Sequence, residues 1–179
     1  QKHSGKGGIL SSPGLANIFM AHCRWATVGD VNEANAHPFE TNKLVGMHNG
    51  TLTDWEYAWD PHGRTDSELM FDDMSKKGIL PVLNELAYSS AYAITIYDKK
   101  SRKLYMARNE DRTLSIGFNR DAGVMYWASE FYMMMMAAER NNVKVDGFFL
   151  KPGLLYEIDV DKIKKGDTAP WVTHPIIKV

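Results

Sequence analysis

Two strand–turn–strand units in the second half of the sequence limit the possible folds most strongly. Residues 92–97 and 103–108 each have the composition of a strand, and a polar turn separates them. Residues 114–118 and 124–128 repeat this arrangement around a turn rich in Asn, Asp and Gly. Strands joined by such short turns pair in antiparallel fashion, so this half of the chain predicts antiparallel sheets.

Three helices are predicted among these strands. The longest begins at a capping box, with Thr65 as the N-cap and Glu68 at the third helical position, and ends at Lys76-Lys77-Gly78. Cations and a glycine suit the C-terminus of a helix. A shorter helix is expected over 81–86, and another over 129–140, with serine as its N-cap and a glutamate in its first turn.

The remaining strands complete an α+β pattern. They are expected at residues 18–23, 43–47, 148–150 and 154–158. Strands in hairpin series with helices inserted between them predict antiparallel sheets covered by helices. No GxGxxG motif follows a strand, so a dinucleotide-binding fold has no support. We expect one domain over residues 1–179, with residues 1–8 as a flexible lead-in.

Charge and composition narrow the function classes. The 179 residues are 44% apolar and 24% charged, with a formal net charge of −1, which gives no reason to expect nucleic acid or an acidic membrane as a partner. No apolar run approaches the roughly 20 residues that span a bilayer. The single cysteine, Cys23, excludes an internal disulfide and favours the cytoplasm.

Three polar segments lie at strand ends or at a helix start, where side chains and backbone amides can converge on one cleft. They are Arg24–Gly29, His48–Gly50 and Thr65–Glu68. Each also has a purely structural interpretation. Asn49-Gly50 is the commonest hairpin-turn dipeptide, and Asp66 would complement a helix dipole. Arg24 would form a surface ion pair, and Trp25 would simply pack against its neighbours.

Four signatures, taken together and in this order, favour the functional interpretation. They are Arg24-Trp25-Ala26-Thr27 with Gly29, Asn35-Ala36-His37-Pro38, His48-Asn49-Gly50, and Thr65-Asp66-Ser67-Glu68. In this order the chain resembles the glutaminase domain of class II glutamine amidotransferases, which are N-terminal-nucleophile hydrolases, and is similar to the glutaminase half of glucosamine-6-phosphate synthase. The resemblance is strongest over residues 21–158. Weaker matches are Ala91-Tyr92-Ala93, Ala107-Arg108 and Ala128-Ser129-Glu130.

The resemblance implies how the substrate glutamine is held. Arg24 would pair with its α-carboxylate in a bidentate, charge-assisted contact. Asp66 would accept its α-ammonium. Trp25 and Thr27 would belong to a loop that closes over the bound amino acid, with Thr27 near the substrate.

The resemblance also implies a catalytic arrangement and a fold. The Asn49 side-chain amide and the Gly50 N–H would form the oxyanion hole, and His37 would order its own loop rather than act in catalysis. The expected fold is a four-layer αββα sandwich of two antiparallel sheets, with N-terminal strands missing from this chain. The implied reaction is hydrolysis of glutamine to glutamate and ammonia, without metal or organic cofactor. The ammonia would pass to a synthase domain or subunit, and a homo-oligomer is compatible with this.

Two departures from the family pattern bear on catalysis. The family nucleophile is an N-terminal cysteine whose own α-amine acts as base, whereas this sequence begins with Gln1. We expect an upstream segment that carries the cysteine. The alternative is a non-catalytic binding or assembly protein that retains the sandwich. A self-processing amidase of the same superfamily is disfavoured, because Arg24 and Asp66 suit a zwitterionic amino acid. Val28 replaces a histidine of many relatives, which bears on loop closure and on the choice of acceptor. Cys23 directly precedes Arg24, where relatives have a residue buried in a strand, so the resemblance implies a small buried hydrophobe rather than a reactive thiol.

Overall fold

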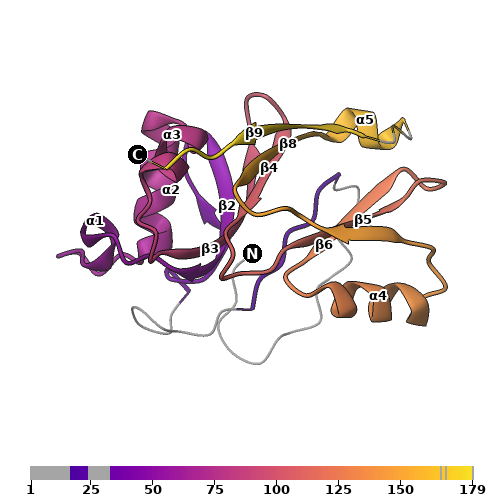
Figure 1. Cartoon of the computed structure of the whole chain (residues 1–179), viewed down its shortest axis with the longest axis horizontal. Coiled ribbons are helices and arrows are strands. Elements are labelled where there is room, and N and C mark those ends of the chain that lie inside the picture. Colours follow the sequence, from indigo (N-terminus) through magenta and orange to yellow (C-terminus); the bar gives the residue numbers. More distant parts are fainter. Residues whose placement is uncertain (1–16, 24–32, 166, 168, 179) are drawn as a thin grey trace.

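Two antiparallel sheets form the centre of the molecule (Figure 1). The computed structural model describes residues 17–23, 33–165, 167 and 169–178. The larger sheet has the spatial order β1 (Phe39–Glu40), β2 (Leu44–Thr51), β3 (Ala91–Asp98), β4 (Lys103–Arg108), β8 (Leu154–Asp159) and β9 (Trp171–Pro175). The smaller sheet has the order β6 (Val124–Ala128), β5 (Ser115–Asn119) and β7 (Asp146–Phe149).

Helices cover the outer faces of the two sheets. The five helices of the described residues are α1 (Trp55–Ala58), α2 (Asp66–Lys77), α3 (Ile79–Glu85), α4 (Phe131–Arg140) and α5 (Val160–Lys164). In Figure 1, α2 and α3 lie against the larger sheet and α4 lies beneath the smaller one, on the far side of the molecule. The layers therefore follow the expected helix–sheet–sheet–helix order.

Two apolar cores hold these layers together. One lies between the larger sheet and helices α2 and α3, and its largest fully buried side chains include Phe71 from α2 and Ile94 from β3. The other lies between the sheets, where Met106 of β4 and Ile116 of β5 are also fully buried. Alternate residues of β3 and β4 contribute to opposite cores, because successive strand side chains point to opposite faces.

Helix α2 begins and ends where its sequence predicts. The Thr65 hydroxyl accepts a hydrogen bond from the Glu68 N–H at 3.3 Å. At the other end the Gly78 N–H donates to the Met74 carbonyl at 3.0 Å, next to two lysines in the last turn. Both ends therefore satisfy backbone groups that an uncapped helix leaves without partners.

Several predicted elements differ in detail. Residues 18–23 were expected to be a strand, but among the described residues they join no sheet. Ile18 packs against the core between the sheets, so its burial needs no ladder pairing. Helix α4 has Glu130 as its N-cap rather than Ser129, and no side chain caps it. Strand β9, which was not expected from the sequence, pairs with β8 as an edge strand.

Candidate active site

A cavity of about 540 Å³ opens beside the end of β2. Four parts of the chain line it: the segment that ends at Cys23, the last residues of β2, the loop after β4, and the residue that precedes α4. The lining residues are His22, Cys23, His48, Asn49, Gly50, Thr51, Glu110, Asp111, Arg112, Thr113 and Glu130. Two of the predicted site residues, Asn49 and Gly50, are therefore in one cavity.

Asn49 and Gly50 lie within strand β2, not in a hairpin turn. Asn49 pairs with Ala93 and Gly50 with Tyr92 of β3. Because strand side chains alternate between faces, the exposed Asn49 side chain and the buried His48 side chain belong to opposite faces of the sheet. The structure thus contradicts the turn interpretation, and it leaves an amide side chain and a neighbouring backbone segment beside the same cavity.

Gly50 is required by the close approach of strand β3. Its φ is +153°, and a Cβ built at this position would lie 1.9 Å from the Ala91 carbonyl oxygen. No side chain fits in that space, so the backbone of residue 50 stays in direct contact with β3 at the cavity wall.

Asp66 is the first residue of α2, and its carboxylate is bonded across the helix–strand boundary. One oxygen, Oδ2, accepts a hydrogen bond from the Leu52 N–H at 3.0 Å, and Oδ1 accepts one from the Ser67 N–H at 2.8 Å. Its side chain is buried, and it is not among the residues that line the cavity. A carboxylate that only complemented the dipole of α2 would not need a bond to Leu52. Asp66 therefore also fixes the start of α2 to the residues that follow β2.

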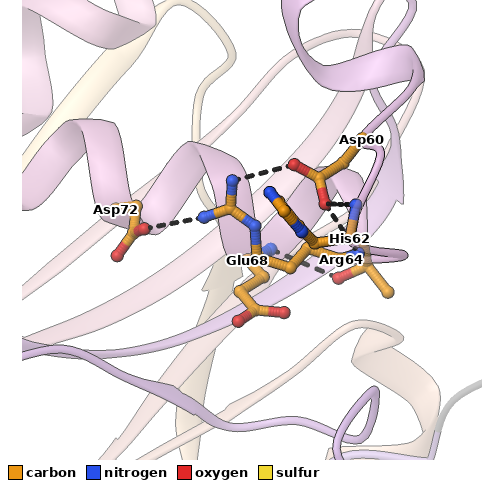
Figure 2. Close-up of polar contacts among 6 residues, drawn as sticks. Asp60, His62, Arg64, Glu68 and Asp72 are labelled. Atoms are coloured by element: carbon orange, nitrogen blue, oxygen red, sulfur yellow. Dashed lines mark hydrogen bonds and ion pairs between the residues drawn. The ribbon is translucent and has the colours of Figure 1, made fainter.

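The turn before α2 is held by an ion-pair network that Figure 2 shows in close-up. Arg64 donates to Asp60 at 2.8 Å and to Asp72 at 3.2 Å, while the second Asp60 oxygen accepts from the backbone N–H groups of His62 and Arg64. The hydrogen bond from Arg64 lowers the pKa of the Asp60 carboxyl to about 2. The network fixes the residues that immediately precede Asp66.

The predicted carboxylate clamp and closing loop, Arg24, Trp25 and Thr27, lie outside the described residues. The segment before them is described up to Cys23. The His22 ring lies 4.2 Å from the His37 ring, which in turn contacts Phe39 at 4.8 Å edge to face. The loop around His37 therefore packs against the segment that leads to Arg24, and its proposed ordering role stays a prediction.

The expectation for Cys23 is wrong. The thiol is exposed and lines the cavity instead of packing in a core. The resemblance implied a residue buried in a strand at this position, whereas residues 18–23 join no sheet among the described residues, so no strand directs the side chain into a core.

The far wall of the cavity contains residues that sequence reasoning did not assign to the site. The Thr113 hydroxyl donates to the Glu130 carboxylate at 3.0 Å, joining the loop after β4 to the start of α4. Arg108, the last residue of β4, holds this loop by donating to the carbonyls of Leu150 at 2.6 Å and Arg112 at 3.1 Å. The weak matches at Ala107-Arg108 and Ser129-Glu130 were the available signals for this wall.

Within the part of the chain that the structure describes, no three His, Cys, Asp or Glu side chains are grouped to hold a metal ion. In the same part, every helix is too short or too polar to cross a membrane.

Comparison with known families gives a consistent match. Residues 9–88 match the family described as class II glutamine amidotransferases. This region includes all four sequence signatures, together with Asn49, Gly50 and Asp66.

Curated relatives match over most of this chain but over a minor part of their own. The chain is 28% identical to the glutamine–fructose-6-phosphate aminotransferase (isomerizing) of Thermococcus kodakarensis, with 96% of this chain and 30% of that protein aligned. It is 30% identical to the enzyme of the same name from Streptococcus pneumoniae R6, with 85% and 31% aligned. The chain thus spans less than a third of the length of these relatives.

Solved structures share the arrangement of layers. The allosteric regulatory enzyme of purine biosynthesis superposes with a TM-score of 0.61 at 22% identity, over 87% of this chain and 34% of that one. The glutamine phosphoribosylpyrophosphate amidotransferase of B. subtilis gives 0.60 at 21% identity, with the same coverage. These similarities concern the fold, and they confirm the predicted two-sheet sandwich.

Proposed function

Because the chain carries a class II glutamine amidotransferase domain, we propose that the protein hydrolyses the side-chain amide of glutamine and delivers the ammonia to an acceptor. The observation that carries this proposal is the position of Asn49 and Gly50 at the wall of one cavity, at the end of β2. An amide side chain and an adjacent backbone N–H are the donors that a tetrahedral oxyanion needs.

The reaction proceeds through a thioester in this proposal. A cysteine thiolate attacks the side-chain carbonyl carbon of glutamine, and the carbonyl oxygen becomes the oxyanion held by Asn49 and Gly50. The carbon–nitrogen bond breaks, and the nitrogen leaves as ammonia after taking up a proton. Water then attacks the thioester carbon and releases glutamate and the thiol. As in the resembled family, the thiol belongs to the N-terminal cysteine of the mature protein.

Two charged groups recognise the free amino acid. Arg24 pairs with the α-carboxylate, and Asp66 accepts the α-ammonium, so an amino acid within a peptide is excluded at both ends. Trp25 and Thr27 close over the bound molecule. The position of Asp66 supports this assignment, because its carboxylate is bonded to the N–H of Leu52, the residue that directly follows the cavity-lining Thr51.

The names of the relatives specify fructose 6-phosphate as their acceptor, and for this protein we propose a synthase domain or subunit in the cytoplasm that receives ammonia directly.

A trapping assay on the full-length protein tests the proposal. Glutamine and hydroxylamine are added together, and glutamate, ammonia and γ-glutamyl hydroxamate are quantified by mass spectrometry. We expect all three products, because hydroxylamine intercepts the thioester in competition with water. Intact mass and N-terminal sequencing identify the residue that carries the γ-glutamyl group. The absence of both glutamine hydrolysis and glutamine binding would contradict the proposal and favour a binding or assembly protein.

A further inference from the structure

His48 lies at the centre of a hydrogen-bond chain that joins three elements. Its Nδ1 is 2.8 Å from the hydroxyl of Ser67 at the start of α2, and its Nε2 is 3.3 Å from the carbonyl oxygen of Ala91 at the start of β3. His48 is only 2% exposed, although it borders the cavity. One side chain therefore connects the end of β2 with both α2 and β3.

The contact with Ala91 determines which ring nitrogen carries the proton. A carbonyl oxygen can only accept, so Nε2 donates to it, and Nδ1 of the neutral ring accepts the hydroxyl proton of Ser67. Burial lowers the pKa of His48, and the nearby charge of Asp66 opposes that shift. Both ring nitrogens of the neutral form thus have partners, without a buried charge.

The hydrogen bonds through His48 lead to both groups that are proposed to hold glutamine. On one side, the Ser67 N–H donates to the Asp66 carboxylate at 2.8 Å, while the Ser67 hydroxyl proton is directed to His48. On the other side, a Cβ on Gly50 would lie 2.8 Å from Nε2 of His48 and 1.9 Å from the Ala91 oxygen. The Gly50 backbone therefore packs directly against the bonded His48–Ala91 pair.

We propose that His48, acting through Ser67, is a positioning residue that fixes the separation between the Gly50 N–H and the Asp66 carboxylate. The inference rests on the proposed function, in which these groups hold the amide oxygen and the α-ammonium of one glutamine. A fixed separation suits one side-chain length, so the link discriminates against asparagine, which is one methylene shorter. A single methylene is commonly worth about 10–200-fold in specificity.

Four variants of the full-length protein test the link by steady-state kinetics. Ser67→Ala removes the hydroxyl but keeps the N–H bond to Asp66, and Ser67→Thr retains the hydroxyl. His48→Phe removes both ring contacts at similar size. Ser75→Ala, on the same helix but away from the cavity, is the matched control.

The expected kinetic pattern is specific to positioning. Ser67→Ala lowers kcat/KM for glutamine about tenfold, as expected for one lost buried hydrogen bond. His48→Phe lowers it about 10²-fold, with kcat carrying most of the loss. In Ser67→Ala the preference for glutamine over asparagine falls about tenfold. Ser67→Thr recovers most of the lost activity, and Ser75→Ala behaves as the wild type.

A second measurement follows the same link without catalysis. Amide hydrogen exchange at Leu52 reports on its bond to Asp66, and therefore on how firmly the start of α2 is held against β2. We expect exchange at Leu52 to rise about tenfold in Ser67→Ala and to be unchanged in Ser75→Ala.

The two measurements separate the inference from the proposed function. Faster exchange at Leu52 in Ser67→Ala, in a protein that neither binds nor hydrolyses glutamine, would support the link and refute the function. Unchanged exchange together with unchanged kinetics in a folded Ser67→Ala protein would overturn the positioning role, whatever the activity of the wild type. If His48→Phe does not fold, Ser67→Ala and Ser67→Thr decide the matter alone.

Discussion

The Asp66 carboxylate accepts a hydrogen bond from the Leu52 N–H at 3.0 Å, across 14 positions of the sequence. The bond joins the first residue of α2 to the chain that leaves β2, directly after the proposed oxyanion donors. A group proposed to bind substrate thus also holds the site together.

The dual role of Asp66 predicts a combined loss in Asp66→Asn. The amide has one acceptor oxygen where the carboxylate has two, so its NH₂ group faces a backbone N–H, and stability falls by about 1–3 kcal/mol. Loss of the charge raises KM for glutamine about 10–100-fold. Urea unfolding and initial-rate kinetics measure the two effects. Asp73→Asn, on the same helix, is the control and should leave KM unchanged. If KM is also unchanged in Asp66→Asn, Asp66 takes no part in substrate recognition.

Asn49→Ala is expected to separate catalysis from stability. The side chain is exposed at the cavity, so the free energy of unfolding changes by less than about 0.5 kcal/mol. Loss of one oxyanion donor lowers kcat about 10²–10³-fold. Asn42→Ala, an exposed position outside the cavity, should leave the kinetics unchanged. A wild-type kcat in Asn49→Ala would exclude its side chain from the oxyanion hole.

Gly50→Ala tests the close approach of β3. The new Cβ has to displace the Ala91 carbonyl oxygen, and such overpacking costs about 1–3 kcal/mol. The shifted backbone also moves the Gly50 N–H, which lowers kcat/KM about 10²-fold. Gly63 has a φ of +74° and open space around its Cβ position, so Gly63→Ala costs stability through its backbone alone and keeps activity. Equal activities of the two variants would argue against the Gly50 donor.

Local sequence signals predicted the elements whose contacts are local. The Thr65 cap, the Lys76-Lys77-Gly78 end of α2, and the hairpins β3–β4 and β5–β6 were all expected and are present. Each depends on residues a few positions apart.

Features set by distant pairing were not predictable in the same way. Asn49-Gly50 has the composition of a turn, yet eight consecutive pairings with β3, between residues 40 to 54 positions apart, keep it in a strand. The contact between His48 and Ser67 spans 19 residues, and neither residue type signals it. Cys23 was expected in a core because the resembled family buries the matching residue in a strand, and residues 18–23 join no sheet here.

Acid should weaken the turn that precedes α2. The hydrogen bond from Arg64 holds the pKa of Asp60 at about 2, below its ordinary value of 3.8. A carboxyl with a lowered folded-state pKa stabilises the fold above its unfolded-state pKa, and this contribution disappears as the pH falls through the folded-state value. We therefore expect the urea midpoint of the wild type to exceed that of Asp60→Asn above about pH 4, and the difference to vanish towards pH 2. Asp121→Asn serves as the exposed control, and a difference independent of pH would refute the ion-pair explanation.

The exposed thiol of Cys23 offers a probe of the cavity that does not depend on catalysis. Iodoacetamide should modify Cys23 in the absence of ligand, since the side chain is exposed at the cavity wall. Saturating glutamine should slow the modification, because the bound amino acid would occupy the same space. Glutamine derivatives that lack a free α-amine should protect Cys23 poorly. Peptide mapping by mass spectrometry follows this site alone.

Cys23→Ser should keep kcat within about threefold, because the proposed nucleophile is a different, N-terminal thiol. Abolished turnover in a folded Cys23→Ser protein would instead make Cys23 the nucleophile, and the thioester would then form at the wall that β2 and Cys23 share.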